Sequence, residues 1–96
     1  MKFDTSPDKL RWDLLPIEEV EEIVQILSYG SERYADNNWQ LVENGKERYY
    51  AAMMRHLVSW RKGKQRDDES NLNHLAHAAC NLLFLMWLDN HREEAV

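Results

Sequence analysis

Helix-breaking residues are scarce in this chain. Three glycines and two prolines occur among 96 residues, and no proline follows Pro16. Glycine weakens a helix and proline interrupts it, so long uninterrupted helical segments can form here. Apolar residues make up 44% of the sequence, which is enough material for a core. We therefore expect a chain that is ordered along most of its length and mostly helical.

Apolar residues at helical spacing and terminal signals locate three helices. Pro16 suits the first turn of a helix, and Glu18 and Glu19 after it favour the positive end of the helix dipole. Gly63 suits the left-handed residue that ends a helix, and Ser70 suits an N-cap. The pattern predicts an all-α fold, a small bundle of three main helices at residues 16–34, 47–62 and 71–90.

The length allows one domain. Residues 1–15 lack helical periodicity and are expected to form an N-terminal arm, residues 16–90 the helical domain, and residues 91–96 a C-terminal tail. The arm is expected to be pinned by its apolar residues, which are Leu10, Trp12, Leu14 and Leu15.

Aromatic residues and methionines are numerous for so short a chain. Four Trp, four Tyr and four Met occur in 96 residues. A core of this size is thin, and a monomer would leave much of that apolar surface exposed. We expect the bundle to be completed by oligomerisation, as a homodimer or homotetramer.

Charge and composition exclude several classes of protein. The net charge of −5 argues against nonspecific binding to a nucleic acid, which requires an electropositive face. The longest apolar run, Leu82 to Leu88, is too short to span a bilayer, and we see no signal sequence. Cys80 is the only cysteine and is expected to be a small buried residue. We expect a protein of the reducing cytoplasm that binds neither nucleic acid nor membrane.

The third segment carries a polar stripe. At helical spacing, His74, His77 and Asn81 share one side, and the other side holds Leu72, Leu75, Ala79, Leu83 and Met86. A helix of this kind is expected to pack in the core and to line a site. The alternative is that the two histidines are solvated or hydrogen-bonded and have no function.

Several segments together resemble the phage dATP/dGTP diphosphohydrolase family. The resemblance covers roughly residues 9–88, and the order and spacing of its motifs carry it. The segments are Arg11-Trp12-Asp13-Leu14-Leu15-Pro16, Tyr29-Gly30, Tyr34, Asn38-Trp39, Tyr49-Tyr50-Ala51-Ala52-Met53-Met54-Arg55-His56-Leu57 and His77-Ala78-Ala79-Cys80-Asn81-Leu82-Leu83-Phe84-Leu85.

The resemblance implies a MazG-like, all-α nucleotide pyrophosphohydrolase, phage-encoded and acting in the host cytoplasm. Such an enzyme converts a deoxypurine triphosphate, dATP or dGTP, to monophosphate and pyrophosphate with Mg²⁺ or Mn²⁺. Hard cations require oxygen ligands. Glu18, Glu19 and Glu22 match the MazG spacing of metal-binding carboxylates, although an acidic first turn also has a purely structural explanation.

The second MazG motif, Glu-x-x-Asp on a later helix, is missing. His74, His77 and Asn81 stand in its place, in a form that agrees with the closer phage family. We predict catalytic roles for Glu22, His74 and His77, in binding metal or activating water, and substrate binding by Asn81.

Arg55 and His56 are further candidates for substrate binding. Small residues around Arg55 leave room for a ligand, and a guanidinium group suits bidentate contact with phosphate. The alternative for Arg55 is a salt bridge between helices or subunits. His56 is expected either to face the histidines of the third helix or to be a hydrogen-bonded core residue.

Asp67 and Glu69 precede the third helix and are predicted as metal ligands, although acids there also stabilise a helix N-terminus. The chain departs from the phage pattern at Lys64, where a glutamate is usual, and at Asn71 and Asn73, which replace a glycine and a proline. The loss of a carboxylate at Lys64 puts catalysis in question more than binding.

Arg33, Tyr34, Asn38 and Trp39 match a family segment that is rich in basic, aromatic and amide groups. Tyr34 or Trp39 could stack on a purine, and Asn38 could hydrogen-bond to it. Exposed tryptophans serve equally often as interface anchors, so both roles stay open for Trp39.

The preferred hypothesis is a metal-dependent dNTP pyrophosphohydrolase. The alternative, motivated by Lys64, is a catalytically inactive relative that binds and sequesters a nucleotide or a nucleotide-derived signal, as a phage anti-defence protein would. A helix-turn-helix DNA-binding protein is disfavoured by the aromatic content of the second helix and the overall acidity.

Overall fold

The computed structural model describes residues 9–91, which form three long helices and no strand. Helix α1 spans Ile17–Arg33, α2 spans Gly45–Arg61 and α3 spans His74–Asn90, with short 3₁₀ helices η2 at Trp12–Leu14 and η3 at Asn38–Leu41. The predicted all-α fold is confirmed. The first eight residues of the predicted arm and the predicted tail after residue 91 lie outside the described residues.

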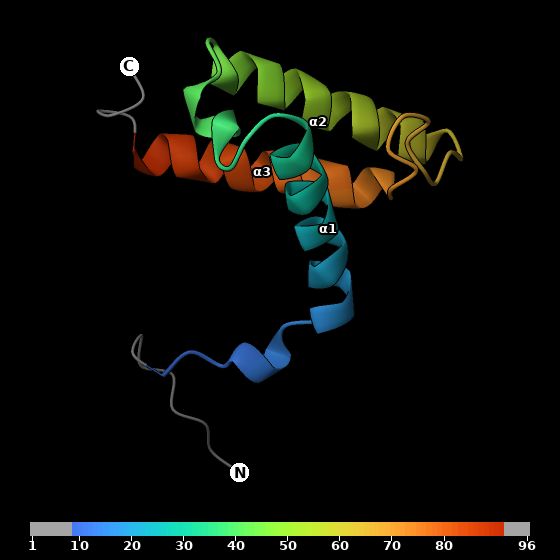
Figure 1. The fold of residues 1–96 in the computed structure, drawn as a ribbon. Coiled ribbons are helices and arrows are strands. Elements are labelled where there is room, and N and C mark those ends of the chain that lie inside the picture. Colours follow the sequence, from blue (N-terminus) through green and yellow to red (C-terminus); the bar gives the residue numbers. More distant parts are fainter. Residues whose placement is uncertain (1–8, 92–96) are drawn as a thin grey trace.

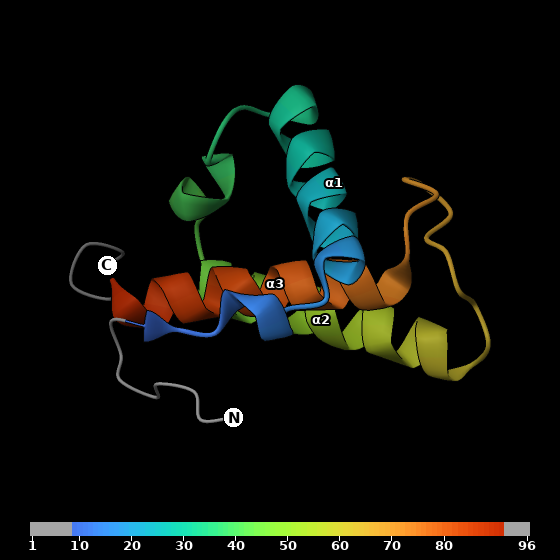
Figure 2. The ribbon, with the colours of Figure 1, turned by 90° about the horizontal axis from the view of Figure 1, so that it is seen from below.

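Helices α2 and α3 lie side by side and antiparallel, and α1 crosses the pair at a steep angle (Figures 1 and 2). The small core lies where α1 meets α3. There Ile26 of α1 packs against Ala76 and Cys80 of α3, with Ile23, Leu27, Leu72 and Phe84 around them. None of the described large side chains is fully buried, so the thin core expected from the length is present.

The ends of the helices differ slightly from the prediction. Helix α2 ends where expected, with Gly63 at φ 99° two residues after its last residue. Helix α3 begins at His74 rather than near residue 71, and the predicted N-cap Ser70 is wrong. Asn73 is the cap, because its Oδ1 accepts a hydrogen bond of 2.7 Å from the backbone of Leu75.

The residues between α2 and α3 form a closed hairpin loop, residues 62–73. Backbone hydrogen bonds join Asp67 N to Leu72 O (2.8 Å), Asn71 N to Asp67 O (2.8 Å) and His74 N to Gln65 O (2.9 Å). Asn71 adopts the left-handed region at φ 60°, which asparagine tolerates better than most residues. This loop delays the start of α3 and fixes the position of Asp67.

The apolar face predicted for α3 points away from the core. On α3 the polar stripe is the buried side, with His74 at 5% and Asn81 at 8% exposure, because it faces α2 and α1. The arc of apolar residues on the opposite side of α3 is exposed, and we call it the outer face. Its large exposed members are Leu75, Leu82, Leu83 and Met86, with Ala79 between them.

The predicted pinning of the arm is also wrong. The apolar side chains of the arm are exposed because they find no apolar surface on the rest of the described chain, and the arm stands away from the helix pair (Figure 1). These side chains are Leu10, Trp12, Leu14 and Leu15. On α1 the buried residue is Ile26, whereas Ile17 and Val24 of the same helix are exposed. In the described part, none of the helices is long and apolar enough to cross a membrane.

Candidate functional site

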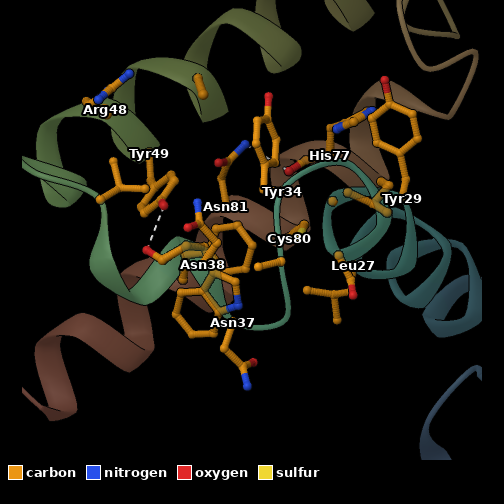
Figure 3. A pocket seen from close by; sticks show the side chains of 18 of the residues that line it. Leu27, Tyr29, Tyr34, Asn37, Asn38, Arg48, Tyr49, His77, Cys80 and Asn81 are labelled. Carbon is orange, nitrogen blue, oxygen red and sulfur yellow. Dashed lines mark hydrogen bonds between the residues drawn. The ribbon is translucent and has the colours of Figure 1, made fainter.

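A pocket of about 1340 Å³ opens between the second half of α1, η3, α2 and α3 (Figure 3). Aromatic packing fixes its η3 wall. The Trp39 ring stacks on Phe84 of α3 with 4.3 Å between ring centroids, and the Tyr49 hydroxyl donates a hydrogen bond of 2.7 Å to the Trp39 carbonyl. Six of the predicted site residues line the pocket: Tyr34, Asn38, Trp39, Arg55, His77 and Asn81.

Two arginines of α2 face the pocket. Arg48 and Arg55 are seven residues apart, which is two helical turns or about 10 Å along the axis, and both line the cavity. Neither forms an ion pair with any residue between 9 and 91. The interhelical salt bridge considered for Arg55 is therefore not formed within the described chain. Arg48 was not predicted as a site residue, although its spacing from Arg55 is a signal that could have identified it.

The aromatic and amide groups of the pocket differ in how freely they can contact a ligand. Tyr34 is 68% exposed and can present a ring face to a ligand. Trp39 is held by Phe84 on one face and by Trp87 at its edge, so it anchors η3 to α3. Asn81 donates to the His77 carbonyl (3.0 Å), which leaves its amide oxygen as the group that could accept a hydrogen bond from a ligand.

Three carboxylates that were not predicted also line the pocket, namely Glu32, Asp36 and Glu47. Asp36 accepts a hydrogen bond from the Ser31 hydroxyl, which holds it at the end of α1. No sequence signal distinguishes these acids from the other exposed acids of the chain. They reach the pocket because the turn after α1 folds back towards α2.

Next to the pocket, three histidines from two helices come together. The Nδ1 atoms of His56 and His74 are 2.8 Å apart, and the His56 ring is stacked on His77 with 4.4 Å between centroids and 7° between planes. His56 faces the histidines of the third helix and also lies within hydrogen-bond distance of His74, so the structure agrees with both alternatives given for it. His77 belongs to both groups, since it lines the pocket and its Nε2 lies 2.7 Å from the Ser70 hydroxyl.

Asp67 joins the histidines from the hairpin loop. Its Oδ2 accepts hydrogen bonds from the backbone of Glu69 (3.0 Å) and Ser70 (2.9 Å). Ligand atoms of His56, Asp67 and His74 all lie within 4.8 Å of one another, a spacing that could hold a metal ion. Among residues 9–91, it is the only such group of His, Cys, Asp or Glu that contains three or more members.

Burial controls the charge of this cluster. It lowers the pKa of His56 to about 4, with the neighbouring His77 ring acting in the same direction. Burial also lowers the pKa of His77. For Asp67, burial raises the pKa, but the backbone hydrogen bonds and the nearby His77 outweigh burial and hold the pKa below its usual value. At neutral pH the cluster therefore contains neutral His56 and His77 rings and an ionised Asp67.

The other predicted metal ligands lie elsewhere. Glu18 and Glu19 are exposed and Glu22 is half-buried, on the first turns of α1, which project beyond the helix pair (Figure 1). Glu69 forms an ion pair with Arg33, whose guanidinium also donates to the Tyr29 hydroxyl at 2.7 Å. The carboxylates predicted for a hard cation thus do not converge within the described part of one chain.

Comparison with known proteins identifies relatives. The family model described as dATP/dGTP diphosphohydrolase, N-terminal, matches residues 1–96. A protein of Salmonella phage PMBT28 named dATP/dGTP diphosphohydrolase is 37% identical over 92 residues, which is 96% of this chain and 30% of that protein. The chain thus spans about a third of the length of this relative. No solved structure matches the chain.

Proposed function

Because this chain belongs to the dATP/dGTP diphosphohydrolase N-terminal family, we propose that it hydrolyses dATP or dGTP to the monophosphate and pyrophosphate. The observation that carries the proposal is the pocket, which combines two arginines that form no ion pair within residues 9–91, an exposed tyrosine and three asparagine amides. A nucleoside triphosphate needs cationic groups for its phosphates and stacking and amide groups for its base.

The residues of the pocket suit the two ends of a nucleotide. Arg48 and Arg55 would bind phosphate oxygens, since guanidinium groups form charge-assisted hydrogen bonds with them. Tyr34 would stack on the purine, and Asn38 and Asn81 would hydrogen-bond to its edge. Arg33 and His56 are also predicted to bind substrate. Neither lines the cavity, so their effect on a bound nucleotide would be indirect.

Hydrolysis requires a water molecule that loses its proton as it attacks phosphorus. His77 is neutral at neutral pH and lines the pocket, so its ring can accept that proton. We propose Glu22 and His74 as further catalytic groups. The acids predicted as ligands of Mg²⁺ or Mn²⁺, which are Glu18, Glu19, Asp67 and Glu69, do not meet within residues 9–91, so no metal-binding step in this reaction is assigned to them. A divalent ion, when bound, would neutralise charge on the phosphate oxygens.

The test is release of pyrophosphate from dGTP and dATP with Mg²⁺ or Mn²⁺. Glu22→Gln and His77→Ala should abolish release while nucleotide binding survives, because the arginine and aromatic contacts remain. Glu21→Gln and His91→Ala are the matched controls. His91, unlike His77, does not line the pocket, and Glu21 is an exposed acid next to Glu22 to which no role is assigned. Full activity of both the Glu22 and the His77 variants would reject these roles.

A second candidate function is sequestration of a nucleotide without turnover. The observation that favours it is Lys64, which pairs with Asp68 at 2.9 Å in the hairpin loop and adds a positive charge beside the acids there. A sequestering protein would show no turnover with any dNTP under Mg²⁺, Mn²⁺ or Co²⁺, yet nucleotide would raise its melting temperature. If Lys64→Glu alone switches on pyrophosphate release in an inactive parent, sequestration is the correct function.

We also propose that the chain forms a homodimer or homotetramer in the host cytoplasm. The support is the exposed outer face of α3 together with the exposed apolar side chains of the arm. Exposed apolar surface of this kind is typical of protein interfaces. Nucleic acid is not expected as a partner, because the net charge of −5 opposes it.

A further inference from the structure

We infer that His56, Asp67 and His74 form a binding site for one transition-metal ion, of the class of Zn²⁺ or Co²⁺, that accepts nitrogen ligands. This inference does not depend on the proposed hydrolysis of nucleotides. The site joins three separate segments of the chain, namely the second half of α2, the hairpin loop and the first residue of α3.

The donor set selects the kind of metal. Two imidazole nitrogens and one carboxylate oxygen suit Zn²⁺, Co²⁺ and similar ions, whereas Mg²⁺ prefers oxygen ligands alone. Three protein ligands also leave one position of a tetrahedral ion open for water. The predicted Mg²⁺ ligands on α1 play no part in this site.

The two histidines require only a small rearrangement. Two nitrogens bound to one tetrahedral ion at about 2.0 to 2.1 Å are about 3.3 Å apart. The Nδ1 atoms of His56 and His74 are 2.8 Å apart, so the two rings must separate by roughly half an ångström to admit the ion. Both atoms already point at each other, and side-chain rotation can supply that movement.

The loop presents Asp67 in a fixed position. The two backbone hydrogen bonds to Oδ2 fix the carboxylate, and the backbone hydrogen bonds between Asp67, Asn71 and Leu72 fix the loop behind it. His56 is further restrained by its stacking on His77. Ligands that are held before the ion arrives lose little freedom on binding, so this arrangement favours metal binding.

The competing explanation is a hydrogen bond between two imidazoles, with one Nδ1 donating and the other accepting. That arrangement would stabilise the fold without any metal. Both explanations predict that loss of His56 destabilises the protein, so stability alone cannot separate them. Direct measurement of bound metal can.

The experiment strips the full chain with a chelator and then titrates it with Zn²⁺, and with Co²⁺ followed by its visible absorption. We expect one ion per chain, a rise in melting temperature on addition of metal, and no comparable effect of Mg²⁺. His56→Gln and Asp67→Asn should weaken binding at least about tenfold, the scale on which even outer contacts of metal sites act. Circular dichroism in chelator checks that these variants fold.

The matched controls are His91→Gln and Asp68→Asn, which remove the same chemical groups outside the cluster. His91 contacts Trp87 near the end of α3, and Asp68 pairs with Lys64. Both controls should bind one ion as tightly as the unmutated chain. The inference is overturned if the unmutated chain binds no Zn²⁺ or Co²⁺, if folded His56→Gln and Asp67→Asn bind as tightly as the controls, or if the controls lose binding equally.

Discussion

For Arg55, the structure favours binding of a ligand over a salt bridge within the chain. It lines the pocket and has no ion-pair partner in residues 9–91, so its charge is available to a ligand. Arg55→Ala should weaken binding of dGTP or dATP by about 1 to 3 kcal/mol, the scale of a charge-assisted hydrogen bond, and leave the fold intact. Arg55→Lys should recover part of the loss. Calorimetric titration with nucleotide measures both.

Arg61→Ala is the control for this prediction, since Arg61 is an exposed arginine of the same helix that does not line the pocket. Its nucleotide affinity should be unchanged. If instead the Arg55 variants bind normally but melt at a lower temperature or dissociate into monomers, Arg55 belongs to the scaffold or to an interface.

Cys80 should be chemically inert in the folded protein. Its side chain is 2% exposed, and burial raises its pKa to about 12, so the thiol is neutral at pH 8. Iodoacetamide should modify it slowly in buffer and rapidly in urea, as read by mass spectrometry. The stabilisation from keeping this thiol neutral is present below the ordinary pKa near 9 and is lost as pH rises towards 12. Fast modification in buffer would reveal local opening of α3.

At the scale of single elements, α1 contains a glycine that its own packing does not require. A Cβ added at Gly30 would meet no atom within 4 Å, yet Gly30 lines the pocket. Gly30→Ala should raise the free energy of unfolding by about 0.5 to 1 kcal/mol, because alanine favours the helix. If the bare backbone serves a ligand, the same change should weaken nucleotide binding. Thermal melting and calorimetric titration separate the two effects.

Gly45→Ala is the contrasting change in α2. There the added Cβ would approach Leu88 Cδ1 at 3.2 Å and Tyr49 Cε2 at 3.3 Å, so crowding should cancel the gain in helix propensity. Equal stabilisation by both substitutions would show that α2 and α3 are less tightly packed than described.

The three helices could be predicted from the sequence, but their orientation could not. Few breakers, apolar periodicity and Gly63 locate each helix to within three residues. The sequence predicts that the apolar side of α3 is buried, whereas its histidine side is. The histidine side can be the buried one because it meets another histidine, His56, which a single sequence does not show. The start of α3 lies later than predicted because Asp67 and Ser70 hydrogen-bond to the backbone of the hairpin, together with main-chain hydrogen bonds, and so extend the loop to Asn73.

The residues of the pocket also divide into those that the sequence could identify and those that it could not. Arg55, His77 and Asn81 could be selected because their chemistry and spacing resemble a known pattern, and the structure brings them to one cavity. Glu32 and Glu47 could not be selected, because only the turn between α1 and α2 brings them to the same side.

For the whole molecule, the outer face of α3 leads to a prediction about assembly. Leu82, Leu83 and Met86 are about half exposed on one arc of the helix, opposite its contacts with α2. Sedimentation at micromolar concentration should show at least a dimer. Leu83→Lys should shift the protein towards the monomer, because a buried unpaired charge opposes association.

Leu41→Lys is the control, since it adds the same charge at an exposed leucine of η3. It should leave the assembly unchanged. A monomer for the unmutated protein at micromolar concentration would rule out the assembly, and an unchanged Leu83→Lys oligomer would move the interface to another surface.

The hairpin loop between α2 and α3 has a consequence for how this protein can change during evolution. Main-chain hydrogen bonds and the side chains of Arg66, Asp67 and Ser70 fix its shape, whereas the Lys64 side chain only pairs with Asp68 at the surface. A mutation at position 64 can therefore reverse the charge of the loop without moving Asp67 or the start of α3. Descendants of one ancestor could gain or lose a carboxylate here by a single substitution at little structural cost. Turnover could then be lost or restored within a lineage while the fold and the pocket stay the same.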